Sequence, residues 1–334
     1  MPKISIIMPV YNKQNYIQRS LDSVLNQDFL DYELIVVDDG STDNSLKILE
    51  EYQSKDSRIT VIHTENHGVS HARNVGLEHI NGEWVQFLDG DDYIDKKYLN
   101  NVQSVINDVS IDIIFSSFYK VNEVGEVLDT VKTEYTDIQS GEKLLDSFLQ
   151  YQWKNGYYGF ISNKLMRRRL IERTNARFNE NLRLAEDLDF FAQMYPAVNV
   201  SYYTDNNSFY YLQTDDSLSK DQDIDYLGQL EIQKRIRQWA IDAGAFVINK
   251  DTVDGQVCRY AAYAVFDAAM KNRDIASICN TLLNDEVVNQ CLNSKYVSNP
   301  VHKRIISAMQ KKDIHKLDYY LRTREAIKKI LGRR

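Results

Sequence analysis

Short apolar runs alternate with amphipathic segments along the first 115 residues of the chain. The runs are rich in Ile, Val and Leu and have the length of buried strands. The segments between them repeat apolar residues at the spacing of one helix face. The predicted strands span residues 4–8, 33–37, 59–62, 84–88 and 111–115, and predicted helices span about 13–27, 68–80 and 96–107. A further helix is expected to begin near Ser41 and Thr42, both good N-cap types, and to reach Tyr52. Regular alternation with short connections predicts an α/β fold with a mostly parallel central sheet flanked by helices.

After residue 115 the alternation is less regular. The expected elements are a polar excursion or hairpin at 120–136, a helix at 140–151, an apolar and basic stretch at 160–170, a helix at 185–195 and strands at 198–203 and 208–212. From about residue 221 the pattern predicts helices only. We therefore expect two domains, residues 1–220 around the sheet and residues 221–334 as a helical appendage.

Composition narrows the class of protein. The net charge of −8 over 334 residues argues against general nucleic-acid binding. No apolar run approaches the roughly 20 residues that cross a membrane. The three cysteines lack metal-ligand spacing, and the chain begins with a strand pattern that leaves no room for a signal peptide, so we expect a cytoplasmic protein.

The stretch from Trp84 to Tyr93 holds the strongest candidate chemistry. A buried strand ends there in Asp89, Asp91 and Asp92, three acids within four positions. Acids packed this closely are tolerated if water solvates them or if a cation binds among them. Carboxylate oxygens are the ligands that Mg²⁺ and Mn²⁺ prefer. Taken alone, the pattern is also typical of a solvated surface turn.

Two other loops are expected at the same edge of the sheet. Residues 9–12 follow the first strand and residues 38–41 follow the second. The carboxyl ends of parallel strands meet at one edge, where open α/β sheets bind ligands. A nucleoside diphosphate would fit such a site, because the loops offer a tyrosine, an amide, an acid that accepts a base N–H and a pair of metal ligands. Singly, Asp39 and Ser41 would be ordinary turn residues.

Five motifs, in order, resemble those of family 2 glycosyltransferases with the GT-A fold. The motifs are Pro9-Val10-Tyr11-Asn12, Val36-Val37-Asp38-Asp39-Gly40-Ser41, Gly68-Val69-Ser70-His71-Ala72-Arg73-Asn74, Phe87-Leu88-Asp89-Gly90-Asp91-Asp92 and Glu186-Asp187. The resemblance covers roughly residues 1–215. It implies an inverting enzyme that transfers a hexose or N-acetylhexosamine from a UDP-sugar to a hydroxyl of a glycan acceptor, forming a β-linkage. Cell-surface polysaccharide, teichoic acid and glycoprotein glycans are the implied products.

The resemblance also implies roles on the donor side of the site. Pro9, Tyr11 and Asp39 would hold the nucleotide base, and Arg73 would lie near the nucleotide. Asp89 would touch the ribose and assist a Mn²⁺ or Mg²⁺ ion on the diphosphate. Asp91 would be the main ligand of that ion.

On the acceptor side, the resemblance makes Asp187 the general base that takes the proton of the attacking hydroxyl. From the residues alone, Glu186 and Asp187 are equally typical of a helix start, where acids are favoured by the dipole. Glu186 and Lys164 are candidate positioning residues. Many relatives carry a histidine after the base; here residues 210–219 contain none, and Asp215 or a water molecule would substitute.

The chain's last stretch is basic, with eleven Lys and Arg against three acids from Val301 onward. A helix at 317–331 would be amphipathic and basic, a pattern typical of peripheral binding to an anionic membrane. This pattern favours a lipid-linked glycan acceptor at the inner membrane surface. A protein-linked glycan acceptor, with the helical domain serving for packing or as a homodimer interface, is the alternative.

Proteins of other classes share parts of the pattern. A non-catalytic sugar-nucleotide-binding partner subunit of a glycosyltransferase complex would keep the nucleotide loops and lack a working base. A nucleotidyltransferase would carry a Gly-rich basic loop after the first strand, where this chain has Pro9-Val10-Tyr11-Asn12. A Rossmann dehydrogenase is disfavoured because no Gly-x-Gly-x-x-Gly follows a strand.

Overall fold

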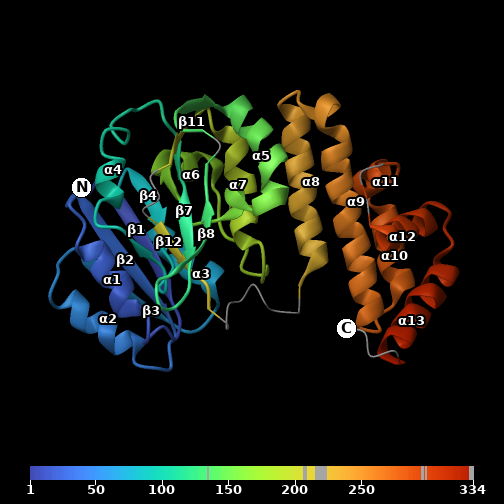
Figure 1. The fold of residues 1–334 in the computed structure, drawn as a ribbon, viewed down its shortest axis with the longest axis horizontal. Coiled ribbons are helices and arrows are strands. Elements are labelled where there is room, and N and C mark those ends of the chain that lie inside the picture. Colours follow the sequence, from blue (N-terminus) through green and yellow to red (C-terminus); the bar gives the residue numbers. More distant parts are fainter. Residues whose placement is uncertain (134, 206–208, 215–223, 295–296, 298, 331–334) are drawn as a thin grey trace. The chain divides into compact units, whose positions relative to one another are not determined.

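The computed structural model describes the 334-residue chain except residues 134, 206–208, 215–223, 295–296, 298 and 331–334 (Figure 1). It divides into two compact units, Met1–Asp221 and Gln222–Arg334. The first unit holds the sheets that the apolar runs predict, and the second is helical throughout its described part. The types of secondary structure in the two units agree with the predicted α/β fold and helical appendage.

An eight-stranded sheet forms the centre of the first unit, in the order β3-β2-β1-β4-β10-β6-β11-β9. The strands are β1 (Ile4–Val10), β2 (Tyr32–Asp39), β3 (Ile59–Thr64), β4 (Trp84–Phe87), β6 (Ile113–Ser116), β9 (Ile138–Ser140), β10 (Lys164–Arg167) and β11 (Val200–Thr204). Strands β1 to β4 are parallel, so their carboxyl ends share one edge. Strand β10 runs antiparallel to both neighbours, and the sheet is therefore mixed beyond β4.

A second sheet of four strands has the order β5-β12-β7-β8. Its strands are β5 (Tyr93–Ile94), β7 (Phe118–Val121), β8 (Val127–Val131) and β12 (Phe209–Leu212). Strands β7 and β8 form a hairpin, one of the two alternatives expected for residues 120–136, and it begins two residues earlier, at Phe118. Strand β5 directly follows the acidic loop and pairs with β12, so the small sheet anchors the carboxyl end of that loop.

Seven α-helices accompany these strands in the described part of the first unit: α1 (Ile17–Leu25), α2 (Ser45–Gln53), α3 (Val69–Glu78), α4 (Tyr98–Asn101), α5 (Gly141–Asn155), α6 (Arg168–Thr174) and α7 (Glu186–Met194). Short 3-10 helices occur at Tyr157–Gly159 and Tyr195–Ala197. Helix α3 packs closely on β1, because a Cβ on Gly76 would lie 2.4 Å from Ile7 Cγ2. Glycine at this position lets the helix approach the sheet.

Three predicted helices have wrong boundaries. Helix α1 begins at Ile17, not near residue 13. Helix α2 begins at Ser45, not near Ser41 or Thr42. The Ser41 hydroxyl instead accepts the Asn12 N–H, and the Thr42 N–H donates to the Asn12 side chain, so both residues join the loop after β1. The helix expected at 96–107 is a single turn, Tyr98–Asn101.

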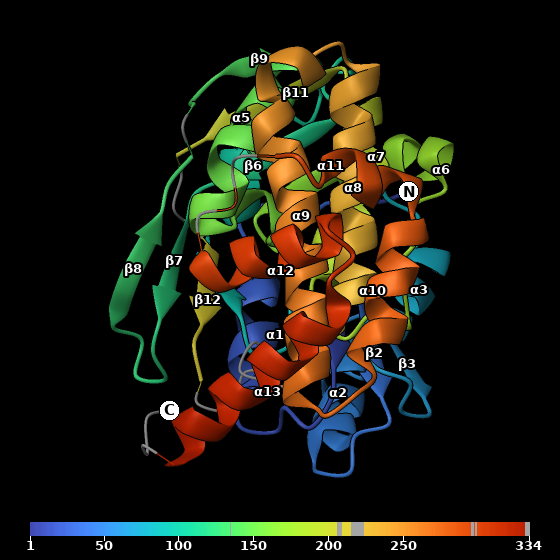
Figure 2. The same ribbon diagram turned by 90° about the vertical axis from the view of Figure 1, so that its right-hand side faces the viewer.

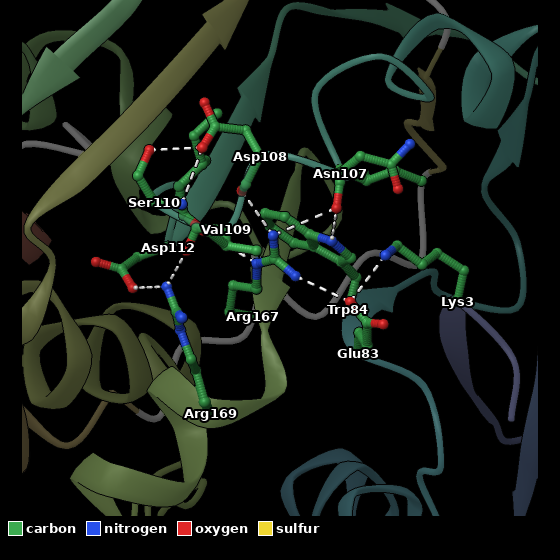
Figure 3. Close-up of polar contacts among 12 residues, drawn as sticks. Lys3, Glu83, Trp84, Asn107, Asp108, Val109, Ser110, Asp112, Arg167 and Arg169 are labelled. Atoms are coloured by element: carbon green, nitrogen blue, oxygen red, sulfur yellow. Dashed lines mark hydrogen bonds and ion pairs between the residues drawn. The ribbon is translucent and has the colours of Figure 1, made fainter.

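A buried arginine binds the backbone that follows this helical turn. Figure 3 shows the Arg167 guanidinium against Trp84, with its carbon 4.2 Å from the ring centroid. It donates to the carbonyls of Ile106 and Asp108, at 3.3 and 2.6 Å, and to the Glu83 carboxylate at 3.1 Å. These contacts hold the backbone at Ile106 and Asp108 beside β10. This network lies at the amino end of β4, opposite the acidic loop.

The second unit contains α8 (Tyr226–Asp242), α9 (Phe246–Met270), α10 (Ile275–Asn284), α11 (Glu286–Cys291), α12 (Pro300–Gln310) and α13 (Ile314–Ile330). Figure 2 shows α9 behind α10, α12 and α13, which share one apolar core with it. The three cysteines are free and buried in that core. Among the described residues, no helix combines the length and the apolar character that a membrane span requires.

Candidate active site

Three loops meet at the carboxyl ends of β1, β2 and β4. The loop after β1 is tied to the loop after β2, because the Asn12 N–H donates to Ser41 Oγ at 3.0 Å and the Lys13 N–H to Ser45 Oγ at 2.8 Å. The loop after β4 also lies against β1, since a Cβ on Gly90 would be 3.2 Å from the Pro9 carbonyl. Tyr11 projects from this edge with 45% of its surface exposed. The convergence expected from the parallel order is thus present.

Asp39 connects the end of β2 to the start of α3. Its two carboxylate oxygens accept the backbone N–H groups of His67 and Gly68 at 2.9 and 2.8 Å, and only 3% of the residue is exposed. Gly68 has φ 96°, a conformation that favours glycine, immediately before the helix. The carboxylate is therefore fixed in orientation. Each oxygen has a second lone pair, so this contact is compatible with the predicted acceptance of a base N–H.

Arg73, on α3, brings the donor-side and acceptor-side acids together. One guanidinium nitrogen lies 3.0 Å from Asp89, and the other lies 2.7 Å from Asp187 and 3.2 Å from Glu186. The Arg73 side chain is only 3% exposed. Burial alone lowers the pKa of the guanidinium, but the three carboxylates outweigh burial and raise that pKa. Arg73 is therefore a permanent cation at the centre of three acids.

Asp187 is the second residue of α7 and remains 22% exposed. The turn before the helix places Ala185 at φ 70°, a left-handed conformation that directs Glu186 and Asp187 back toward α3. Burial raises the pKa of the Asp187 carboxyl, and Arg73 opposes that shift. A carboxylate with a raised pKa accepts a proton more readily than an ordinary surface aspartate.

The acidic loop after β4 separates its three aspartates by environment. Asp89 faces Arg73, and Asp91 forms an ion pair with Lys13 at 2.5 Å. Asp92 is 1% exposed and accepts the Leu212 N–H at 2.8 Å, which joins the loop to β12. Burial raises the pKa of Asp92. Asp92, which the motif leaves without a chemical role, is thus a structural residue.

The donor set fits a hard divalent cation that also binds phosphate. Asp89 and Asp91 offer partly exposed carboxylates, at 28% and 17%. The described residues contain no group of three or more His, Cys, Asp or Glu side chains that could hold a metal ion without other ligands. Magnesium is commonly held by one or two carboxylates together with substrate phosphates and water. Asp89 and Asp91 supply that number of protein ligands.

Lys164, the first residue of β10, is fully buried. Its ammonium donates to the Asn163 side chain at 2.6 Å, to the Tyr157 carbonyl at 3.2 Å and to the Phe160 carbonyl. It also lies 4.5 Å from the centroid of Phe191, on α7. Burial lowers the pKa of Lys164 well below its usual value. Lys164 therefore holds residues 157–163 against α7 and contacts none of the three acids around Arg73 directly. Asp215 lies outside the described residues.

Sequence reasoning missed two contacts of this site. Lys13, which binds Asp91, directly follows the Pro9-Val10-Tyr11-Asn12 motif. Arg73 was expected near the nucleotide. Its contacts with Glu186 and Asp187 join positions 113 and 114 residues apart in the chain, respectively. An arginine in a helix motif gives no signal of a partner so distant. The surplus of acids in the motifs is the one feature that calls for such a cation.

Acids at the carboxyl edge of an α/β sheet are typical of ligand-binding proteins with this type of fold. Comparison with known proteins identifies the family. Residues 5–174 match the family described as Glycosyl transferase family 2, and the chain belongs to that family. The predicted resemblance is thereby confirmed.

Relatives of known sequence and structure agree with this assignment. The chain is 31% identical over 220 residues to the uncharacterized glycosyltransferase EpsJ of Bacillus subtilis (strain 168), covering 66% of this chain and 64% of EpsJ. It is 32% identical over 214 residues to the poly(ribitol-phosphate) beta-N-acetylglucosaminyltransferase TarS of Staphylococcus aureus (strain Mu50), covering 63% of this chain and 35% of TarS. The chain thus spans less than two thirds of these relatives.

The crystal structure of S. aureus TarS 1-349 in complex with UDP-GlcNAc has the same fold. It superposes with a TM-score of 0.72 at 24% identity, covering 96% of this chain and 90% of the TarS chain. The coverage includes the helical unit as well as the sheets. The GT-A fold with a helical C-terminal part, predicted from the motifs and the pattern, is confirmed.

Proposed function

We propose that this protein is an inverting glycosyltransferase that moves a hexose or N-acetylhexosamine from a UDP-sugar to a glycan hydroxyl, with Mn²⁺ or Mg²⁺ at Asp89 and Asp91. The contacts of Arg73 carry the proposal. One guanidinium spans Asp89, on the predicted donor side, and Asp187, on the predicted acceptor side, at 3.0 and 2.7 Å. The two predicted halves of the site therefore lie side by side, as a direct transfer between two substrates requires.

The residues of the donor side would bind and orient the nucleotide. Tyr11 would supply an exposed ring and Pro9 the adjoining backbone. Asp39 would accept the base N–H from the position in which His67 and Gly68 hold its carboxylate. Asp89 and Asp91 would hold the divalent ion, which when bound neutralises the diphosphate and stabilises it as a leaving group. Asp89, held by Arg73, would also touch the ribose.

Asp187 would then act on the acceptor. The acceptor hydroxyl attacks the anomeric carbon from the face opposite the diphosphate and gives its proton to Asp187. The new bond joins the acceptor oxygen to the anomeric carbon as the bond to the diphosphate oxygen breaks, and UDP leaves with that electron pair. One displacement inverts the configuration, so an α-linked donor gives a β-linkage. Arg73 and Glu186 orient the Asp187 carboxylate through the ion pairs already described.

A screen of UDP-sugars tests this proposal. UDP release is measured from UDP-Glc, UDP-Gal, UDP-GlcNAc and UDP-GalNAc, each with Mn²⁺, with Mg²⁺ and with a chelator. We expect metal-dependent release from at least one donor, and UDP-GlcNAc is the first candidate because the fold matches TarS bound to it. Tight UDP binding without release, in the presence of glycan acceptors, would favour the alternative of a non-catalytic sugar-nucleotide-binding subunit. Absence of both binding and release would contradict both.

The acceptor is proposed to be a glycan of a surface polysaccharide, a teichoic acid or a glycoprotein, lipid-linked or protein-linked. Helix α13 bears on the lipid-linked case. Its Leu317 and Leu321 are buried in the core of the helical unit, whereas Tyr319 is 75% exposed and Lys316 and Arg322 face outward. Peripheral membrane contact would therefore use the basic face and Tyr319. Flotation with anionic liposomes at low and high salt tests it: salt-sensitive binding supports the membrane role, and none favours a protein-linked acceptor or a homodimer interface.

A further inference from the structure

The Lys13 side chain forms an ion pair with Asp91, the predicted metal ligand, and its backbone is fixed in position. Its ammonium lies 2.5 Å from Asp91 Oδ2. The backbone is fixed, since the Lys13 N–H donates to Ser45 at 2.8 Å and its carbonyl accepts the N–H groups of Tyr16 and Ile17, both at 2.9 Å. Asn12, just before it, has φ 51°. Lys13 can therefore change partner by moving its side chain alone.

The two cations at the acidic loop differ in how firmly they are held. Arg73 is 3% exposed and bound to three carboxylates, so it cannot leave without exposing all of them to one another. Lys13 is 32% exposed and forms its ion pair with a single carboxylate. A lysine ammonium is a compact charge on a flexible stem, whereas a guanidinium is a rigid fork. Lys13 is the exchangeable cation of the pair.

A divalent ion on Asp91 has to share space with this ammonium. A divalent ion and an ammonium that lie close together near a protein surface repel each other. An anion between them removes the repulsion. The donor diphosphate, which would bridge the metal ion and the loop after β1, is an anion of suitable charge and position.

We propose that Lys13 is a stand-in cation, which holds Asp91 when no metal ion is bound and transfers to the donor diphosphate when a divalent ion takes that carboxylate. The consequence is coupling: the metal ion binds weakly to the free protein and strongly together with UDP. Coupling between two ligands is reciprocal, so UDP equally requires the metal ion. This inference rests on the proposed function and assigns Lys13 a positioning role within it.

Metal titration without turnover tests the proposal. Mn²⁺ binding is followed by the electron paramagnetic resonance of the free ion, with and without UDP, for the wild-type protein, Lys13→Met, Lys13→Arg and Lys97→Met. Lys97 is an exposed lysine shortly after the acidic loop and serves as the matched control. We expect Lys13→Met to bind Mn²⁺ about tenfold more tightly without UDP, and the Mn²⁺–UDP coupling to fall by at least that factor. Lys97→Met should match the wild type, and Lys13→Arg should keep weak Mn²⁺ binding without UDP.

The outcomes separate this inference from the proposed function. If the wild type shows Mn²⁺-dependent UDP binding and Lys13→Met leaves both Mn²⁺ affinity and coupling unchanged, Lys13 is an ordinary surface ion pair and the inference fails alone. If Lys13→Met binds Mn²⁺ more weakly, Lys13 supports the metal site and the inference is likewise wrong. If the wild type binds neither Mn²⁺ nor UDP, the proposed function fails as well.

Discussion

Two buried arginines lie at opposite ends of the β4 strand and show how a structural charge differs from a functional one. Arg167 donates to backbone carbonyls and packs on Trp84, and its carboxylate partner, Glu83, is shared with Lys3. Arg73 faces three carboxylates at once. Arg167 and Lys3 share one carboxylate, so their cluster has a surplus of one positive charge. The Arg73 cluster, with one guanidinium and three carboxylates, has a surplus of two negative charges. A surplus of buried negative charge is typical of a functional site, where side chains with perturbed pKa values cluster.

The largest expected effect concerns the base. Asp187→Asn keeps the shape of the side chain and removes its ability to take a proton, so transfer should fall by about 10²–10⁴-fold. UDP binding with Mn²⁺ should remain close to wild type, because Asp187 lies on the acceptor side of Arg73. Steady-state transfer and calorimetric UDP binding provide the two measurements. Asp28→Asn, which changes an exposed surface pair with Lys96, is the control. Rapid turnover by Asp187→Asn would show that another group is the base.

A matched pair of substitutions tests the comparison directly. Arg73→Lys keeps the charge but cannot reach both Asp89 and Asp187, so their relative position should change and transfer should fall by about 10²-fold. Arg167→Lys removes the guanidinium hydrogen bonds to the carbonyls of Ile106, Asp108 and Ile111 and should lower the free energy of unfolding by about 2–3 kcal/mol. Its kcat, measured well below the melting temperature, should stay near wild type.

An effect of Arg73→Lys on stability alone, or of Arg167→Lys on catalysis, would contradict the distinction between the two arginines. Thermal melting and transfer assays are run on both variants under the same buffer conditions. If Arg73→Lys changes only the melting temperature, its cluster is structural. If the Arg167→Lys variant is folded and its kcat is lower, the amino end of β4 affects catalysis at the opposite end of the strand.

The contrast also explains what the sequence could predict. Loops at the carboxyl ends of β1, β2 and β4 follow from the parallel alternation, and the motifs in them mark the donor side. The approach of Arg73 to Asp187 depends on helices α3 and α7, which belong to distant parts of the chain. Periodicity carries no information on such tertiary contacts. Strand β10, only four residues long and antiparallel between β4 and β6, was likewise hidden inside an apolar and basic stretch.

A smaller effect is expected on the metal side. Asp91→Ala removes the main predicted ligand and should abolish the gain in UDP affinity that Mn²⁺ provides, a factor of about 5–150 in typical coupled sites. Asp92→Asn is the comparison, because Asp92 accepts the Leu212 N–H and should affect stability instead of metal binding. Calorimetry of UDP with and without Mn²⁺ measures the coupling. Equal coupling in Asp91→Ala and the wild type would remove Asp91 from the metal site.

The smallest expected effect is a shift in the dependence of kcat on pH. Burial raises the pKa of Asp187, Arg73 and Lys164 oppose the shift, and the nearby Glu186 and Asp89 carboxylates add to it. Only the ionised carboxylate accepts a proton, so transfer should decline as the pH falls through this raised pKa.

Removing one neighbouring negative charge then has a defined sign. In Glu186→Gln the pKa of Asp187 should be lower, because one repelling carboxylate is gone. In addition, Arg73 Nη1, which contacts both acids in the wild type, then faces Asp187 as its one remaining carboxylate. The acid limb of kcat should therefore move to lower pH. Glu172→Gln, an exposed change on α6, should leave the profile in place. A limb that stays fixed in Glu186→Gln would mean that the group titrating in kcat is not Asp187, and the surplus charge around Arg73 would then serve metal binding alone.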